Sequence, residues 1–167
     1  MKNLYAKALL ISIAFIAVSF VYADDPIVLK DNKTKMAVNL YSTIDEEDKE
    51  LLFYSNARFG YSVKIPKIFT KVVSLPTNGN GIILESKNRK SRFHVSGGAV
   101  TAEGMLKKTY ETAYNSIGGK DKASYSDIGE NYWELSWWEG EVFHRCKFLI
   151  NDQAWCDCKI SYPASNN

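Results

Sequence analysis

Residues 132–163 read YWELSWWEGEVFHRCKFLINDQAWCDCKISYP and contain three segments in which apolar and polar side chains alternate. A period of two residues is typical of β-strands. The strands that this pattern predicts are 132–138, 141–150 and 154–162. Between them, Glu139-Gly140 predicts a two-residue turn and residues 151–153 predict a three-residue turn. The stretch therefore predicts three consecutive antiparallel strands, and the rest of the fold is arranged around them.

The two turn lengths set the register of these strands, and the register sets the face on which each side chain lies. The first turn places Glu134 opposite Arg145, and the second places Cys146 opposite Cys158. His144 and all three cysteines then share one apolar face. The opposite face carries the charged side chains Glu134, Arg145, Lys147, Asp157 and Lys159. We therefore expect one core face and one more polar face.

Further strands are predicted upstream of this stretch. FGYSVKIP (59–66) alternates in the same way and stops at its proline. GIILES (81–86) and SRFHVSG (91–97) flank the charged segment KNRK (87–90), which indicates a hairpin with a solvated turn. Residues 123–128 predict one more strand. The sheet should thus be mainly antiparallel.

One segment has helical spacing instead. Residues 101–117 are expected to form an amphipathic helix, with Thr101 or a neighbour as the N-cap and Gly118-Gly119 as the stop signal. The apolar stripe of this helix is Leu106, Tyr110, Ala113, Tyr114 and Ile117. The sequence therefore predicts an α+β fold, in which one amphipathic helix packs on the core face of a mainly antiparallel sheet.

The N-terminus indicates export. Lys2 and Lys7 precede the apolar run ALLISIAFIAVSFV (8–21), and the small residue Ala23 follows it. This arrangement is typical of a signal peptide over residues 1–23, and the run is shorter than the ~20 residues of a membrane-spanning helix. We expect a periplasmic or secreted protein with no membrane span after cleavage. The mature chain would have 19 basic and 19 acidic side chains, a balance that argues against nucleic-acid binding.

The three cysteines have several interpretations. In an oxidising compartment, the opposed pair Cys146 and Cys158 is expected to form a disulfide, with Cys156 left as a buried thiol. A different bridge, or three free thiols, stay open as alternatives. A zinc or copper site formed by His144 and the three cysteines is a further alternative. Because C-x-C is not the C-x-x-C spacing of a zinc knuckle, we favour a structural core and predict no metal.

No motif for catalysis is found. The chain has no G-x-S-x-G, no glycine-rich phosphate loop and no H-E-x-x-H. His94 lies between Phe93 and Val95, which face the other way, so it is expected at the surface. We predict a protein that is not an enzyme and has no cofactor. A hydrolase or oxidoreductase with an unrecognised site stays open as an alternative.

The string YSNARFGYSVKIP (54–66) resembles the opening strand of the PsbP-like superfamily, whose fold is shared with the Ran-binding Mog protein. NGNGIILES (78–86) and ISYPAS (160–165) also resemble this family. The matching positions of the first motif are Tyr54, Asn56, Arg58, Phe59, Gly60, Tyr61, Val63 and Pro66. The resemblance covers residues 54–165, which we take as the domain, and leaves residues 24–53 as an N-terminal arm. It implies an α/β/α sandwich, and a non-enzymatic binding or assembly module.

Members of the family usually continue into a C-terminal helix that covers the second face of the sheet, whereas this sequence ends at Asn167. The resemblance therefore implies that the arm or a partner covers the polar face. That face is expected to carry the aromatic anchors Tyr132, Trp138, Phe143 and Trp155. We expect an exported module that binds an envelope protein or a second copy of the chain. The alternative is a metal or small-ligand binder that uses His144, Cys146, Cys156 and Cys158.

Overall fold

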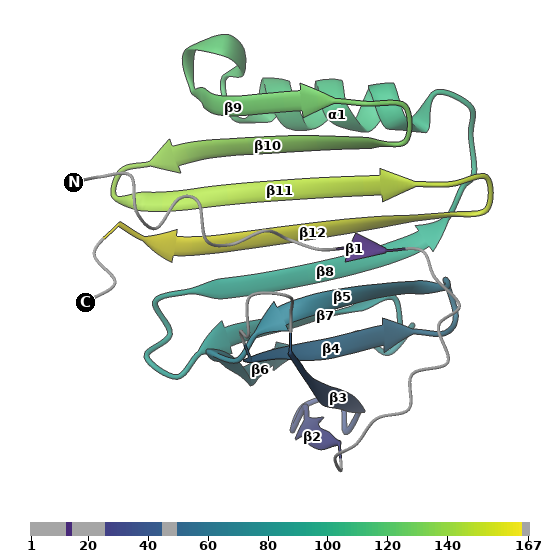
Figure 1. Ribbon diagram of the computed structural model, residues 1–167, viewed down its shortest axis with the longest axis vertical. Helices are drawn as coiled ribbons and strands as arrows, with labels where there is room; N and C mark the ends of the chain where they lie inside the picture. Colours follow the sequence, from purple (N-terminus) through teal and green to yellow (C-terminus); the bar gives the residue numbers. More distant parts are fainter. Residues whose placement is uncertain (1–12, 15–25, 45–49, 165–167) are drawn as a thin grey trace.

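The computed structural model describes residues 13–14, 26–44 and 50–164, which form two antiparallel β-sheets and one α-helix (Figure 1). The five-stranded sheet has the order β1 (Ile13–Ala14), β5 (Tyr61–Pro66), β4 (Glu50–Asn56), β3 (Ala37–Ile44) and β2 (Ile27–Lys30). The seven-stranded sheet has the order β6 (Phe69–Ser74), β7 (Gly81–Ser86), β8 (Arg92–Ala99), β12 (Ala154–Pro163), β11 (Val142–Ile150), β10 (Tyr132–Glu139) and β9 (Ala123–Ile128). The helix α1 is Met105–Ser116, and the short 3-10 helix η1 is Gly119–Asp121. The predicted α+β class with antiparallel sheets is confirmed.

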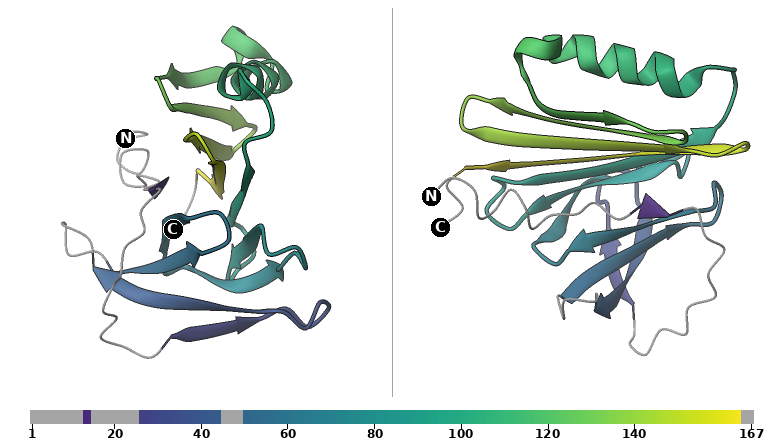
Figure 2. Two further views of the ribbon diagram at one scale, coloured as in Figure 1. Left: turned by 90° about the vertical axis from the view of Figure 1, so that its right-hand side faces the viewer. Right: turned by 45° about the horizontal axis from the view of Figure 1, so that its top comes forward.

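The seven-stranded sheet has two cores, which lie on opposite faces and at opposite ends. The five-stranded sheet packs against one face at β6, β7, β8 and β12, whereas α1 packs against the other face at β10 and β11 (Figure 2). The sandwich core between the sheets contains Leu40, Leu52, Tyr54, Tyr61, Val63, Ile65, Phe69, Ile82, Leu84, Phe93, Val95, Cys156, Cys158 and Ile160. The helix core contains Trp133, Leu135, Cys146 and Phe148, covered by Leu106, Tyr110 and Tyr114. The expected single core face is therefore replaced by two.

The alternation in the predicted strand of residues 59–66 is confirmed. Tyr61, Val63 and Ile65 of β5 all point into the sandwich core and are at most 1% exposed. Burying a side chain of this size contributes about 1.5–3 kcal/mol relative to leaving it in water. Burial of one face thus explains why this segment forms a strand.

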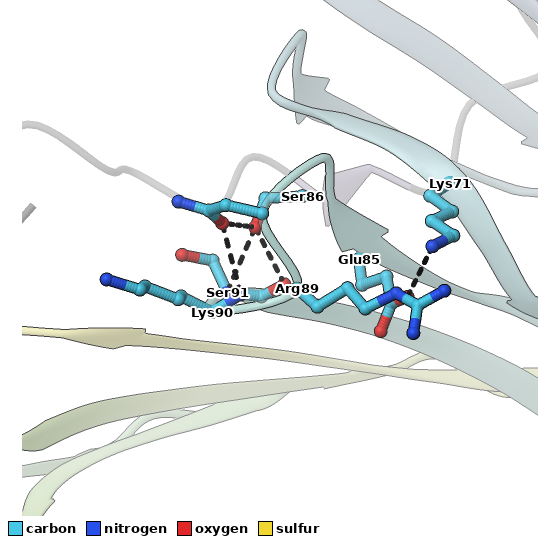
Figure 3. A network of polar contacts seen from close by, with 7 residues as sticks. Lys71, Glu85, Ser86, Arg89, Lys90 and Ser91 are labelled. Atoms are coloured by element: carbon cyan, nitrogen blue, oxygen red, sulfur yellow. Dashed lines mark hydrogen bonds and ion pairs between the residues drawn. The ribbon is translucent and has the colours of Figure 1, made fainter.

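The hairpin predicted around KNRK is also confirmed, as the β7–β8 turn. Ser86 organises it: its hydroxyl lies 2.6 Å from Asn88 Oδ1 and accepts the Ser91 N–H at 3.1 Å (Figure 3). Two of the nearby cations are paired with one carboxylate, because Glu85 lies 3.6 Å from Lys71 and 3.4 Å from Arg89. The basic segment therefore forms a turn with part of its charge neutralised.

The helix is shorter than predicted at its N-terminal end. It begins at Met105 because Gly104 adopts a left-handed conformation, with φ of 67°, and no side chain caps it. The N-cap is therefore Gly104, so Thr101 is not the cap and no side chain of a neighbouring residue replaces it. The C-terminal end agrees with the prediction: α1 stops at Ser116, and Gly118 follows with φ of 95°. Glycine adopts this conformation without steric strain, so it ends the helix readily.

The turn between β10 and β11 differs from the prediction but leaves the faces unchanged. Gly140 and Glu141 form it, so Glu134 lies opposite Lys147 and not Arg145. A shift of two residues along a strand keeps each side chain on its face. Glu134 still binds both cations, with Oε2 2.7 Å from Arg145 Nη2 and Oε1 2.6 Å from Lys147 Nζ.

The turn between β11 and β12 changes the faces. The Asn151 N–H donates to the Ala154 carbonyl, and Ile150 pairs with Trp155, so the loop is one residue longer than predicted. Cys146 therefore pairs with Lys159. A one-residue slip moves every side chain of β12 to the other face. Its apolar positions fill the sandwich core, and its charged positions lie on the side of α1.

The predicted arm is part of the sandwich. It contains a hairpin, β2–β3, and its predicted boundary at residue 53 falls inside β4. Leu40 and Leu52 are at most 1% exposed in the same core as Val95 and Cys158. The predicted signal-peptide cleavage site lies outside the described residues, while Ile13–Ala14 pairs with the edge of β5.

Asp31 ties this hairpin to the chain beyond β6. Its Oδ2 accepts the Leu75 N–H at 3.0 Å and its Oδ1 accepts the Lys33 N–H at 2.8 Å; these bonds hold the pKa of the carboxyl below its usual range. A lowered folded-state pKa adds stability above the unfolded-state pKa, and this stability is lost as pH falls through the folded value. We therefore expect Asp31→Asn to flatten the loss of stability that occurs as pH falls below about 5, measured by urea unfolding. An unchanged slope would contradict this role of Asp31.

Candidate functional site

A cleft of about 990 Å³ lies where α1 leaves the seven-stranded sheet uncovered. One wall is the flank of α1 that carries Met105, Thr109 and Ala113. The floor is formed by β10, β11, β12 and the end of β8. The far rim carries Arg58, Phe59, Asn78 and Asn80. This volume is at the upper end of the range of small-molecule sites.

Three stacked rings form the floor of the cleft, one from each of three neighbouring strands. Trp133 of β10 stacks on Phe148 of β11, with centroids 5.5 Å apart and planes at 4°. Phe148 stacks in turn on Trp155 of β12, at 5.9 Å and 15°. The Trp133 indole N–H also donates to the Thr109 hydroxyl of α1 at 3.0 Å, which fixes the ring against the helix. The aromatic row is thus held at one end by the helix.

The other end of the row depends on glycine. The Trp155 indole lies over Gly98 of β8, where an added Cβ would be 2.9 Å from three of its ring atoms. A real Cβ would have to push the ring away. On the opposite face, the neighbouring Gly97 makes room for the Tyr61 ring, which would be 2.3 Å from an added Cβ. The glycine pair therefore lets one ring lie flat on each face, and the cleft floor extends to β8.

Asp157 places a carboxyl among these apolar groups. The Cys146 thiol donates to its Oδ1 at 3.5 Å, and burial raises the pKa of Asp157, although the charges of His94 and Lys159 oppose this shift. Burial also raises the pKa of Cys146, with the nearby Asp157 charge adding to the effect. Cys146 is therefore held as a thiol, a form that is a poor nucleophile and a poor metal ligand.

Lys159 is the cation of the cleft floor. Its ammonium lies 5.0 Å from the centroid of the Trp137 ring, and within the described part of the chain it forms no ion pair. His144 stacks on the same indole at 4.9 Å and 10°. Burial lowers the pKa of His144, and the charge of Lys159 lowers it further. Lys159 is thus the charge that faces the cleft from this end.

Part of the rim is built by the segment YSNARFGYSVKIP (54–66). Asn56 is 5% exposed, and its Nδ2 donates to the Gly79 carbonyl at 2.8 Å. Its Oδ1 accepts the N–H groups of Arg58 at 3.1 Å and Phe59 at 3.3 Å. One amide therefore joins the turn after β4 to the loop before β7, and both segments line the cleft.

The predicted Cys146–Cys158 disulfide is wrong. All three cysteines are free, because Cys146 lies in the helix core while Cys156 and Cys158 lie in the sandwich core on the other side of the sheet. The reversed faces of β12 are the cause. Burial raises the pKa of Cys158 as well, so it is a packed thiol.

The alternative metal cluster also fails to assemble. His144 and Cys146 point to the α1 side of the sheet, and Cys156 and Cys158 point to the opposite side. Among the residues that the structure describes, no group of three His, Cys, Asp or Glu side chains is placed to hold a metal ion.

The four predicted partner anchors do not share a face. Tyr132, Trp138 and Phe143 lie on the side of the sheet away from α1, whereas Trp155 lies in the cleft. Trp138 is 42% exposed and packs on Phe143 with centroids 5.1 Å apart. Binding of an envelope protein or a second copy by these three rings stays a prediction.

Sequence reasoning missed the cleft residues for different reasons. Alternation placed Trp133 and Trp137 correctly, but as ordinary core. Asp157 and Lys159 were placed on the wrong face with the rest of β12. The available signal was the Gly97-Gly98 pair, because two glycines inside a strand indicate a close approach on each face.

Comparison of the chain with family models, with curated proteins and with solved structures finds no match in any of the three. In the described residues, no helix has the length and hydropathy that a membrane span requires. The structure itself defines the class of the protein: an α+β protein of two antiparallel sheets, with one helix beside an aromatic cleft.

Proposed function

We propose that this chain is an exported, non-enzymatic binding protein with a PsbP-like fold, and that it binds a small apolar ligand in the aromatic cleft. The observation that carries this proposal is the half-buried ring of Trp155, which lies on the floor of a site of about 990 Å³ and is backed by the buried rings of Phe148 and Trp133. Ligand sites are typically apolar and aromatic, with a few polar groups that fix orientation. The cleft has this composition.

The proposed function of the cleft is binding without catalysis. The Cys146 thiol has a raised pKa, and it donates a hydrogen bond to the Asp157 carboxyl and not to an imidazole. Activation of a cysteine nucleophile requires a base or a lowered pKa. The small-ligand alternative raised by the sequence is therefore retained, with the cleft in place of the histidine–cysteine cluster.

Trp155→Ala is expected to weaken binding of the neutral fluorophore N-phenylnaphthylamine by about tenfold, because stacking on one ring contributes about 1–1.5 kcal/mol. The measurement is a fluorescence titration of the purified protein. Trp138→Ala is the matched control, since it removes an exposed tryptophan on the opposite face. Equal affinities of wild type and Trp155→Ala, or no binding by the wild type, would overturn the proposed function.

A further inference from the structure

The charges around the cleft indicate which kind of apolar ligand it takes. Its lining includes the cations Arg58, Lys108 and Lys159, and the anions Glu103 and Asp157. Asp157 is half-buried on the floor, and its Oδ1 accepts the Cys146 thiol at 3.5 Å. Glu103 is exposed, at the start of α1. The lining therefore carries three cations and two anions, a formal charge of +1.

Lys159 is the cation best placed to meet a bound molecule. Arg58 is already engaged, because its guanidinium donates to the Asn78 carbonyl and lies 5.1 Å from the Phe59 ring centroid. Lys108 extends from an exposed position on α1. Lys159 is half-buried on the floor, and no described carboxylate lies within ion-pair distance of it. A half-buried ammonium of this kind is only partly hydrated, so an anion gains more from it than from an exposed lysine.

We propose that the ligand of the cleft is an amphipathic organic anion, whose apolar body packs on the half-buried Trp155 ring beside the α1 wall and whose acidic group binds the Lys159 ammonium. The inference rests on the proposed function and adds the chemical class of the ligand. A carboxylate or a sulfonate on an aromatic or acyl body has this chemistry. A cationic ligand is disfavoured, because Lys159 already occupies the face of Trp137.

A matched pair of fluorophores tests the charge separately from the cleft. N-phenylnaphthylamine and anilinonaphthalene sulfonate have the same aromatic body and differ by one sulfonate. We expect the wild type to bind the sulfonate about tenfold more tightly than the neutral probe, as one charge-assisted contact predicts. Lys159→Met should remove most of this preference and change the affinity for the neutral probe by less than about twofold.

Two further variants complete the test. Lys107→Met removes an exposed lysine of α1 that pairs with Glu111 and does not line the cleft, so it should change neither affinity. Asp157→Asn removes a carboxyl that would repel the sulfonate, so it should strengthen binding of the sulfonate. Lys159→Met should have the opposite effect on the same affinity. Equal binding of both probes by the wild type, or equal losses for both in Lys159→Met, would overturn the anion inference and leave the cleft proposal standing. Failure of both probes to bind the wild type would overturn both.

Discussion

Trp133→Ala is expected to destabilise the protein by about 3–5 kcal/mol, the usual range for truncating a buried tryptophan. The ring is 3% exposed and lies between the sheet and the helix. It stacks on Phe148, meets Tyr110 edge-on with centroids 6.3 Å apart, and donates to Thr109. Truncation removes all of these contacts at once and leaves a cavity beneath α1.

The effect should be concentrated at the helix. No side chain of α1 is itself buried, so the helix depends on what the sheet presents to it. Isolated helices of this length are marginal in water. We therefore expect the amides of α1 to exchange faster in Trp133→Ala than in the wild type, while the amides of β5 stay protected.

The measurements are urea unfolding followed by circular dichroism, and hydrogen exchange resolved by segment. Trp138→Ala is the control, because Trp138 is 42% exposed and its loss should change stability by less than about 1 kcal/mol. If the two variants lose equal stability, Trp133 does not hold the helix. Uniform exchange across both cores would likewise contradict the assignment of two separate cores.

Two separate cores also explain which parts of the fold could be predicted. Alternation is a property of each strand alone, so the faces of β5, β10 and β11 follow from the sequence. An error of two residues at the Gly140-Glu141 turn left those faces intact. Alternation does not encode loop length, so it could not predict the extra residue in the β11–β12 loop.

The assumption of one core then selected the wrong face for β12. The apolar positions of the alternating β12 pattern are Cys156, Cys158 and Ile160. If the sheet had a single core, these side chains would lie beside Cys146. They instead face the second sheet, because the longer β11–β12 loop turns the apolar side chains of β12 toward the sandwich core. The disulfide and the metal cluster failed for this one reason. The cleft could not be predicted either, since it exists only because α1 covers part of the face.

Asn56→Ala is expected to lower stability by about 3 kcal/mol, because unpaired buried polar groups cost about 1–3 kcal/mol each. The amide lies 3.1 Å from the Tyr54 hydroxyl and 3.3 Å from the Tyr61 hydroxyl, and both rings are buried. It also holds the Gly79 carbonyl and two backbone N–H groups. Asn131→Ala removes an exposed asparagine side chain and should have little effect on urea unfolding.

The same substitution should also weaken the cleft, although Asn56 does not line it. Loss of the amide removes the bond from Asn56 to the Gly79 carbonyl and leaves the Arg58 guanidinium bond to the Asn78 carbonyl as a link between the two segments of the far rim. Under conditions where it remains folded, Asn56→Ala is expected to bind N-phenylnaphthylamine several-fold more weakly. The reason is that the rim is less well held, although the aromatic row is unchanged. Unchanged affinity in a destabilised variant would separate the motif from the site. Weakened affinity would mean that Asn56 serves the binding site indirectly, because it positions the backbone of the two rim segments.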